Sequence, residues 1–244
     1  MQDLKQRAKN LRKKVLDLAL EEGECQFGGC LSEIEILISL YDCVLKSHDK
    51  FILSKGHACF PWYILLKEKG YNPKILTHPD LDEQNGIYCT TGSLGHGLPI
   101  AVGMALARKK LKKDGEIYVL MSDGECQEGT TWESALIAAH HKLDNLHAVV
   151  DCNRLQALDQ TAKILNLGKL EEKFDIFGWD SMMVKGHSFE ELIPALNRKS
   201  SYKPLMTIAY TTKGKGVSYM ENDPKWHTRL PRELEINQGY KELS

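Results

Sequence analysis

The amino-acid sequence predicts an α/β protein with an open, mostly parallel sheet and helices on both faces. Two observations support this prediction: short apolar runs recur along the chain, and segments with helical spacing lie between most of them. Strands that alternate with helices favour a parallel sheet, because each connecting helix packs on a face of that sheet. The predicted strands are Phe51–Leu53, Ile117–Met121, Ala148–Asp151, Ser181–Val184 and Leu205–Tyr210, and the predicted helices are Leu31–Leu45, Cys59–Lys69, Gly97–Leu111, Thr131–Leu143 and Phe189–Arg198.

The N-terminal segment is charged throughout, which is typical of a surface helix and not of a signal peptide. The longest apolar passage, "IEILISLYDCVL", contains Glu35 and Asp42 and is shorter than the ~20 apolar residues of a membrane span. We therefore expect a soluble protein. The apolar residues at helical spacing in the N-terminal segment are Leu4, Ala8, Leu11, Val15 and Leu18.

Composition narrows the class of protein. A chain of 244 residues with 42% apolar residues can form one large domain with a full core, and we expect residues 1–244 to form one. The net charge of −1 provides no global field that would attract a nucleic acid or an anionic membrane. The seven cysteines are odd in number, scattered and without a C-x-x-C pair, which indicates reduced thiols in the cytoplasm.

Polar side chains follow two of the predicted strands. Asp123-Gly124 comes directly after Ile117–Met121, and Asn153 follows the next strand. The carboxyl ends of parallel strands form the ligand-binding edge of such a sheet, and a helix that begins near Thr130 would point its N-terminus at the same crevice. A carboxylate and a carboxamide oxygen suit Mg²⁺ or Ca²⁺ held together with phosphate oxygens. The alternative is a purely structural role, in which Asp123-Gly124 forms an ordinary turn and Asn153 caps the segment that follows it.

Four segments make the pattern specific. They are "LSKGHACF" (residues 53–60), "TTGSLGHGLPIAVGMALA" (90–107), "SDGECQEGTTWESALIAAHHKLDNLHAVVDCN" (122–153) and "TKGKGVSYMENDPKWH" (212–227). Together they resemble the diphosphate-binding part of transketolases, and in particular the small subunit of split transketolases, from about Arg7 to Leu230. The resemblance implies the thiamine-diphosphate-binding fold and a thiamine diphosphate cofactor with Mg²⁺ or Ca²⁺. Ser122 stands where the family's G-D-G motif has its first glycine.

The resemblance also implies roles for individual residues. Asp123, Asn153 and the carbonyl of Leu155 match the metal ligands, and the N–H of Gly124 matches a donor to the diphosphate. Two histidines, His57 and His227, match residues that lie against the diphosphate and the reactive thiazolium. On the aminopyrimidine side, Gly92 and Leu94 match backbone contacts. His78 matches a histidine that binds sugar hydroxyls, and Glu128 and Glu133 match carboxylates at the subunit interface that couple two active sites.

Gln26 is the main departure from the family pattern. It stands where transketolases have a histidine that contacts the donor sugar, and a carboxamide forms hydrogen bonds but carries no proton at neutral pH. The donor or acceptor is therefore expected to differ from the usual pentose-pathway sugar phosphates.

Catalysis in this family also needs a glutamate from a separate pyrimidine-binding domain, and the segment after Thr228 is too short to contain one. We expect a partner subunit to supply that domain in an α₂β₂ heterotetramer. Together the two subunits would transfer a two-carbon ketol unit from a ketose to an aldose. Two alternatives remain at this point: a subunit of another thiamine-diphosphate enzyme, of the 2-oxo acid dehydrogenase or deoxyxylulose-phosphate synthase type, and a scaffold without catalytic activity.

Overall fold

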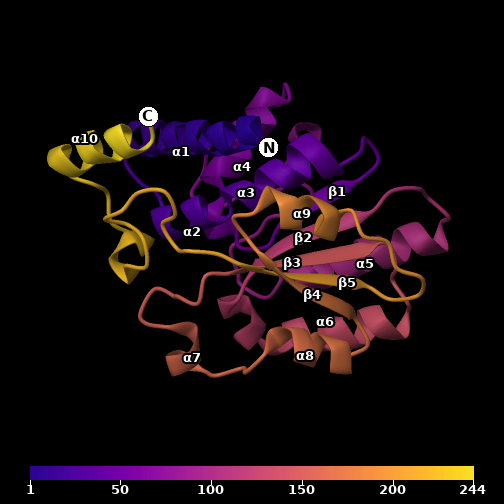
Figure 1. Ribbon diagram of the computed structural model, residues 1–244. Helices are drawn as coiled ribbons and strands as arrows, with labels where there is room; N and C mark the ends of the chain where they lie inside the picture. Colours follow the sequence, from indigo (N-terminus) through magenta and orange to yellow (C-terminus); the bar gives the residue numbers. More distant parts are fainter.

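The computed structural model describes residues 1–244 and contains one five-stranded parallel sheet with the strand order β1-β2-β3-β5-β4 (Figure 1). All five predicted strands are confirmed. The order places β5 between β3 and β4, so the last strand in sequence is an inner strand of the sheet. The strands are β1 (Lys50–Leu53), β2 (Ile117–Ser122), β3 (Leu146–Cys152), β4 (Asp180–Lys185) and β5 (Leu205–Tyr210).

The strands separate two hydrophobic cores, one on each face of the sheet. Successive side chains of a strand point to opposite faces, so Tyr118 and Leu120 of β2 pack into one core while Val119 and Met121 pack into the other. Every residue of β2 is buried, which explains why this strand is a continuous apolar run in the sequence.

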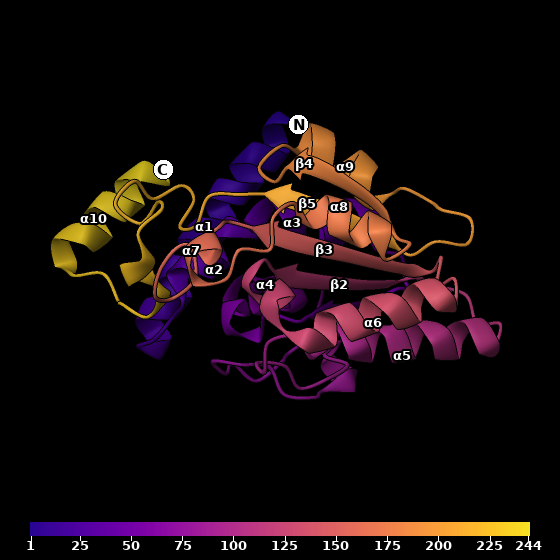
Figure 2. The ribbon, with the colours of Figure 1, turned by 90° about the horizontal axis from the view of Figure 1, so that it is seen from below.

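Helices cover both faces, as predicted (Figures 1 and 2). The first face is covered by α1 (Gln2–Glu22), α2 (Phe27–Ser32), α3 (Ile34–Ile38), α4 (Phe60–Glu68) and α9 (Phe189–Leu196). The second face is covered by α5 (Gly97–Lys110), α6 (Gly129–His140) and α8 (Leu170–Ile176).

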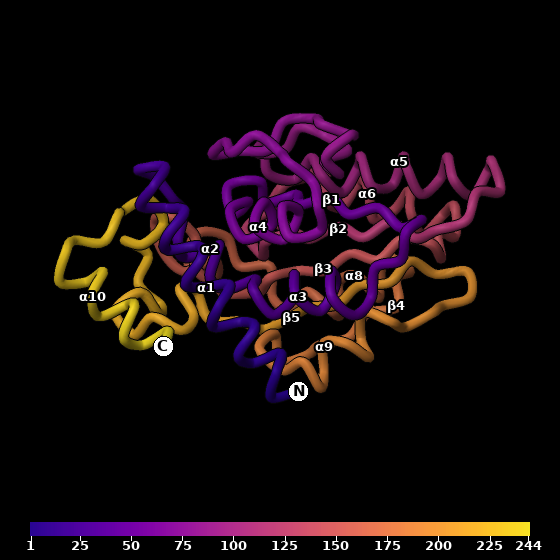
Figure 3. Tube along the Cα trace, turned by 90° about the horizontal axis from the view of Figure 1, so that it is seen from above, coloured from indigo at the N-terminus to yellow at the C-terminus, as the bar shows by residue number.

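Two further helices lie outside these layers. The short α7 (Thr161–Ile164) lies in the long connection after β3, and α10 (Glu233–Glu242) is the last helix of the chain. In Figure 3 α10 lies beside the end of α1, where the hydroxyl of Tyr240 donates a 2.5 Å hydrogen bond to Asp17. The N-terminal surface helix is confirmed as α1, whose inner face buries Leu11 and Val15 completely.

The predicted helix over residues 31–45 was wrong in its form. The helix begins earlier, at Phe27, and is interrupted at Glu33, between α2 and α3. Its last turn, Ser39–Val44, is a π-helix, in which the N–H of Leu45 reaches the carbonyl of Leu40 at 2.8 Å. The interruption coincides with the fully buried side chain of Glu33, which faces the interior next to Lys55.

No helix of the structure is both long enough and apolar enough to cross a membrane. The seven cysteines are all free thiols, and only Cys43 is exposed.

Candidate active site

The carboxyl ends of β2 and β3 meet at a cavity of about 180 Å³. The two strands are parallel neighbours with Ser122 opposite Asp151, so the residues that follow them, Asp123 and Asn153, lie side by side at this edge. Both side chains line the cavity, and both are buried. The predicted meeting of these two strand ends is confirmed.

Asp123 is a buried carboxylate with hydrogen bonds but no cation beside it. One oxygen accepts from the N–H of Gly124 at 3.0 Å. The other accepts from the N–H of Arg154 at 2.8 Å and from the hydroxyl of Thr161 at 3.0 Å. Burial raises the pKa of Asp123 to about 6, because these neutral donors compensate its charge only in part. A divalent cation would complete the compensation.

Oxygen donors of two other kinds lie in the same cavity. The side chain of Asn153 holds its loop by accepting from the N–H of Leu155 at 3.1 Å. The carbonyls of Leu155 and Gln156 accept from the ammonium of Lys213, each at 3.1 Å. A carboxylate, a carboxamide and a main-chain carbonyl form a hard-oxygen set that suits Mg²⁺ or Ca²⁺. The donor set therefore fits a divalent metal.

Two histidines lie on another wall of the cavity. The rings of His57 and His227 are 5.6 Å apart between centroids. Burial, together with the nearby ammonium groups of Lys55 and Lys213, lowers the pKa of His57 well below its usual value and that of His227 to about 4. Both imidazoles are therefore neutral at pH 7 and can donate or accept one hydrogen bond at each nitrogen without adding charge.

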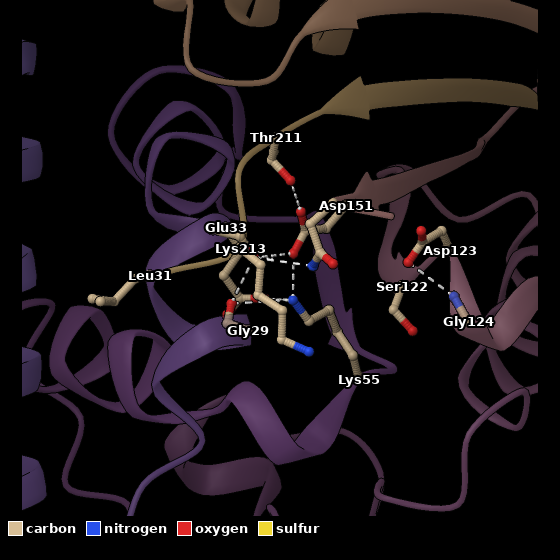
Figure 4. A network of polar contacts seen from close by, with 12 residues as sticks. Gly29, Leu31, Glu33, Lys55, Ser122, Asp123, Gly124, Asp151, Thr211 and Lys213 are labelled. Carbon is tan, nitrogen blue, oxygen red and sulfur yellow. Dashed lines mark hydrogen bonds and ion pairs between the residues drawn. The ribbon is translucent and has the colours of Figure 1, made fainter. Parts of the chain in front are cut away.

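A fully buried ion network lies behind the cavity (Figure 4). The ammonium of Lys55 is 2.5 Å from an Asp151 carboxylate oxygen and 3.0 Å from a Glu33 oxygen, and it donates to the carbonyl of Gly29 at 3.2 Å. Asp151 also accepts from the hydroxyls of Ser32, at 2.5 Å, and of Thr211. The network ties β3 to α2 and to the segment after β1.

Eight of the predicted site residues line this one cavity: Asp123, Asn153, Leu155, Gly124, Glu128, Leu94, His57 and His227. Gly92 and His78 form an adjacent contact outside it. Gly92 has a φ of +140°, and a Cβ there would come within 2.7 Å of the His78 ring, so only glycine fits. His78 itself is exposed.

The structure does not bring the other two predicted residues to the cavity. Gln26 precedes α2 and is half-buried, with its side-chain oxygen buried and without a donor. Glu133 is exposed on α6.

The predicted start of the helix near Thr130 is confirmed, because α6 begins at Gly129. A short 3₁₀ turn, Gly124–Gln127, comes between α6 and the strand, and the sequence pattern did not predict it. Gly124, Gln127 and the N-cap residue Glu128 line the cavity, while the hydroxyl of Thr130 donates to the carbonyl of Gly95. That the N-terminal N–H groups of α6 face the crevice stays a prediction.

Sequence reasoning missed the two lysines of the site. Lys55 is 1% exposed and Lys213 is 3% exposed, and both line the cavity. Buried lysines are rare unless they are paired, and their place in the lining makes both candidates for a role in the site. The available signal was position: Lys55 lies two residues before His57, and Lys213 lies within the "TKGKG" motif.

Comparison with known proteins identifies the family. Residues 41–243 match the family "Transketolase, thiamine diphosphate binding domain". The chain belongs to the transketolase family. Its relatives include two proteins named as subunits of an apulose-4-phosphate transketolase, from Actinobacillus succinogenes and Phocaeicola vulgatus. They are 38% and 36% identical to this chain, over 99% and 96% of its length and 96% and 91% of their own.

Solved transketolase structures share the fold. The transketolase of Campylobacter jejuni superimposes with a TM-score of 0.88 and 27% identity, over 100% of this chain and 43% of that one. The chain thus spans about two fifths of the length of that solved transketolase. The transketolase match decides against the other thiamine-diphosphate enzyme classes, and the cofactor of the family domain is thiamine diphosphate.

Proposed function

We propose that this chain is the diphosphate-binding subunit of a two-subunit transketolase, which transfers a two-carbon ketol unit from a ketose to an aldose. The observation that carries this proposal is the single cavity where Asp123, Asn153 and the Leu155 carbonyl meet Lys213 and the two neutral histidines. It combines oxygen donors for a metal with cationic and neutral donors for a diphosphate, at the edge of the sheet where ligands bind.

Asp123, Asn153 and the Leu155 carbonyl would hold Mg²⁺ or Ca²⁺, which would neutralise part of the charge of the diphosphate. Gly124 supports this assignment: a Cβ there would meet no atom nearer than the Gln156 side chain at 3.4 Å, so packing within the chain does not require glycine. A close approach of a phosphate to the Gly124 N–H would require it.

The remaining residues of the cavity suit the other parts of the cofactor. Lys213, His57 and His227 would donate to diphosphate oxygens. Thiamine diphosphate, when bound, would supply the nucleophilic carbon for ketol transfer. Leu94 lines the cavity and Gly92 lies against His78, and both would contact the aminopyrimidine through their backbone.

A partner subunit would complete the enzyme. The two relatives that match along 96% and 91% of their own length are each named as one subunit of a transketolase, which implies a second subunit in those proteins. We propose that the partner of this chain carries the pyrimidine-binding domain and its glutamate, in an α₂β₂ assembly.

Helix α6 offers a surface for this partner, because Leu136 and Ile137 are 57% and 48% exposed beside Glu133. Glu128, at the rim of the cavity, would lie near this interface.

The substrates would be sugars or sugar phosphates. His78 and Gln26 are the candidates for contacts with sugar hydroxyls, and Gln26 has a side-chain oxygen without a donor that a hydroxyl could satisfy. The two relatives are named for apulose 4-phosphate, so we propose that compound as the first substrate to assay. With seven free thiols, we place the enzyme in the cytoplasm.

The test is ketol transfer by the purified chain with and without its partner. In a coupled assay that follows aldehyde release from a panel of ketose phosphates, the two-subunit complex should turn over and the chain alone should not. Because we propose that the partner supplies the acid that activates the thiazolium, isolated-chain activity equal to that of the complex would overturn the two-subunit proposal.

A further inference from the structure

Glu33 is a fully buried carboxyl that none of the roles above uses. It lies at the break between α2 and α3, with 0% exposure, and points at the ammonium of Lys55 (Figure 4). Lys55 in turn lines the cofactor cavity together with Lys213 and His57. Glu33 is thus one residue removed from the site and is connected to it through Lys55.

The hydrogen bonds around Lys55 are divided unequally between its two carboxylates. Asp151 contacts Lys55 at 2.5 Å and accepts from Ser32 and Thr211 as well, so its charge is compensated. Glu33 contacts Lys55 at 3.0 Å, but neither of its oxygens receives a well-directed hydrogen bond. One ammonium therefore lies beside two buried carboxyl groups, and its closer contact is with Asp151.

The charge balance favours a neutral Glu33. If Glu33 were ionised, the three buried groups would carry a net charge of −1 beside a cavity that is to receive a diphosphate. The pKa of Glu33 is raised to about 8, because burial and the charge of Asp151 raise it more than Lys55 lowers it. Near neutral pH the group holds its proton.

We propose that Glu33 is a positioning residue of the cofactor site: its neutral carboxyl anchors Lys55 at the cavity, and its ionisation weakens binding of the diphosphate. The negative charge of ionised Glu33 would cancel part of the positive potential that Lys55 presents to the anionic cofactor. The inference rests on the diphosphate site proposed above and adds to it a proton that must be present when the cofactor binds.

The direction of the pH dependence follows from the linkage between proton and cofactor. The titratable and charged groups that face Glu33 are Lys55 after β1, Asp151 in β3 and the thiol of Cys59 before α4. Below the pKa of Glu33 the carboxyl is already protonated, so its contribution to affinity is constant. Above that pKa, binding takes up one proton and affinity falls by up to about tenfold per pH unit.

The test compares wild type with Glu33→Gln in the two-subunit enzyme. Titration calorimetry with thiamine diphosphate and Mg²⁺ would be run from about pH 6.5 to 9.5, in buffers of different ionisation enthalpy, so that proton uptake is measured directly. We expect equal affinities at the acid end. At about pH 9 the variant should bind up to about tenfold tighter than wild type, with about one proton less taken up.

Two further variants make the result decisive. Lys213, whose pKa burial lowers to about 8, can also contribute a slope, but that slope would be common to wild type and Glu33→Gln. Glu33→Ala should show the same flatter pH dependence of affinity as Glu33→Gln, because both variants lack the ionisable carboxyl. Thermal unfolding verifies that both Glu33 variants fold. Asp123→Ala should lose affinity at every pH, and unchanged affinity there would contradict the metal site and not the role of Glu33. Identical slopes and proton uptake in wild type and both Glu33 variants would overturn the proposal.

Discussion

The cofactor cavity and the surface around Gln26 and His78 differ in how completely this chain builds them. In the cavity, Lys55, Asp151 and Lys213 are all at most 3% exposed and are held by ion pairs or hydrogen bonds from several elements. On the proposed sugar side, His78 is exposed and the Gln26 oxygen lacks a donor. A fixed cavity suits a cofactor that every turnover reuses, while an incomplete surface suits a substrate whose remaining contacts come from a partner.

The largest expected effect is at the metal site of the cavity. Asp123→Ala removes the only carboxylate of the proposed ligand set, and we expect thiamine diphosphate affinity to fall by roughly 3 kcal/mol, or more than hundredfold. Calorimetry on the two-subunit enzyme with Mg²⁺ measures it. Asp159→Ala is the control, because Asp159 lies in the connection between β3 and α7, is half-exposed and does not line the cavity, and it should bind as wild type does. Unchanged affinity in Asp123→Ala would show that the metal lies elsewhere.

Lys213 tests whether buried charge, and not charge alone, holds the diphosphate. Lys213→Met should weaken thiamine diphosphate binding by about 10-fold to 100-fold, the value of a charge-assisted hydrogen bond of about 1.5–3 kcal/mol. Lys215→Met is the control two residues away, where the ammonium is half-exposed and pairs with Glu221. Equal losses of thiamine diphosphate affinity in the two variants would mean that the overall electrostatic field, and not a direct hydrogen bond from Lys213, holds the diphosphate.

Gln26 tests the incomplete side of the comparison. Gln26→His introduces a side chain that can become charged near the donor's developing oxyanion, and we expect relative kcat/KM among donors to change by about tenfold. The measurement compares xylulose 5-phosphate, fructose 6-phosphate and the two unphosphorylated ketoses in the complete enzyme. A parallel change for all four donors, or none, would show that this position does not select the substrate.

The smallest effect is expected at the interface. Glu133→Gln on the exposed face of α6 should weaken the association of the two subunits by no more than about 1 kcal/mol, because contacts of exposed charges are screened. Sedimentation velocity at several concentrations measures the dissociation constant, with Glu190→Gln on the distant α9 as control. An equally large loss of association in Glu190→Gln would contradict an interface on α6.

The sequence by itself determined the strands and the meeting of Asp123 with Asn153. Continuous apolar runs specify buried strands through local side-chain pattern, and parallel pairing then brings the ends of β2 and β3 to one edge. The family motifs predicted eight of the cavity residues, from His57 to His227. These features follow from short stretches of chain whose neighbours in space are fixed once the fold class is known.

Only the tertiary structure decided the charge network and the break in the helix after Phe27. Lys55 and Asp151 are 96 residues apart in the sequence, and no local pattern states which buried charges will meet. In the sequence, Glu33 fits a continuous helix. In the structure, its burial against Lys55 coincides with the interruption between α2 and α3. Periodicity records which face of an element is buried, whereas the partner of a buried charge depends on how separate elements pack, and that packing determines which groups can hold a cofactor or a proton.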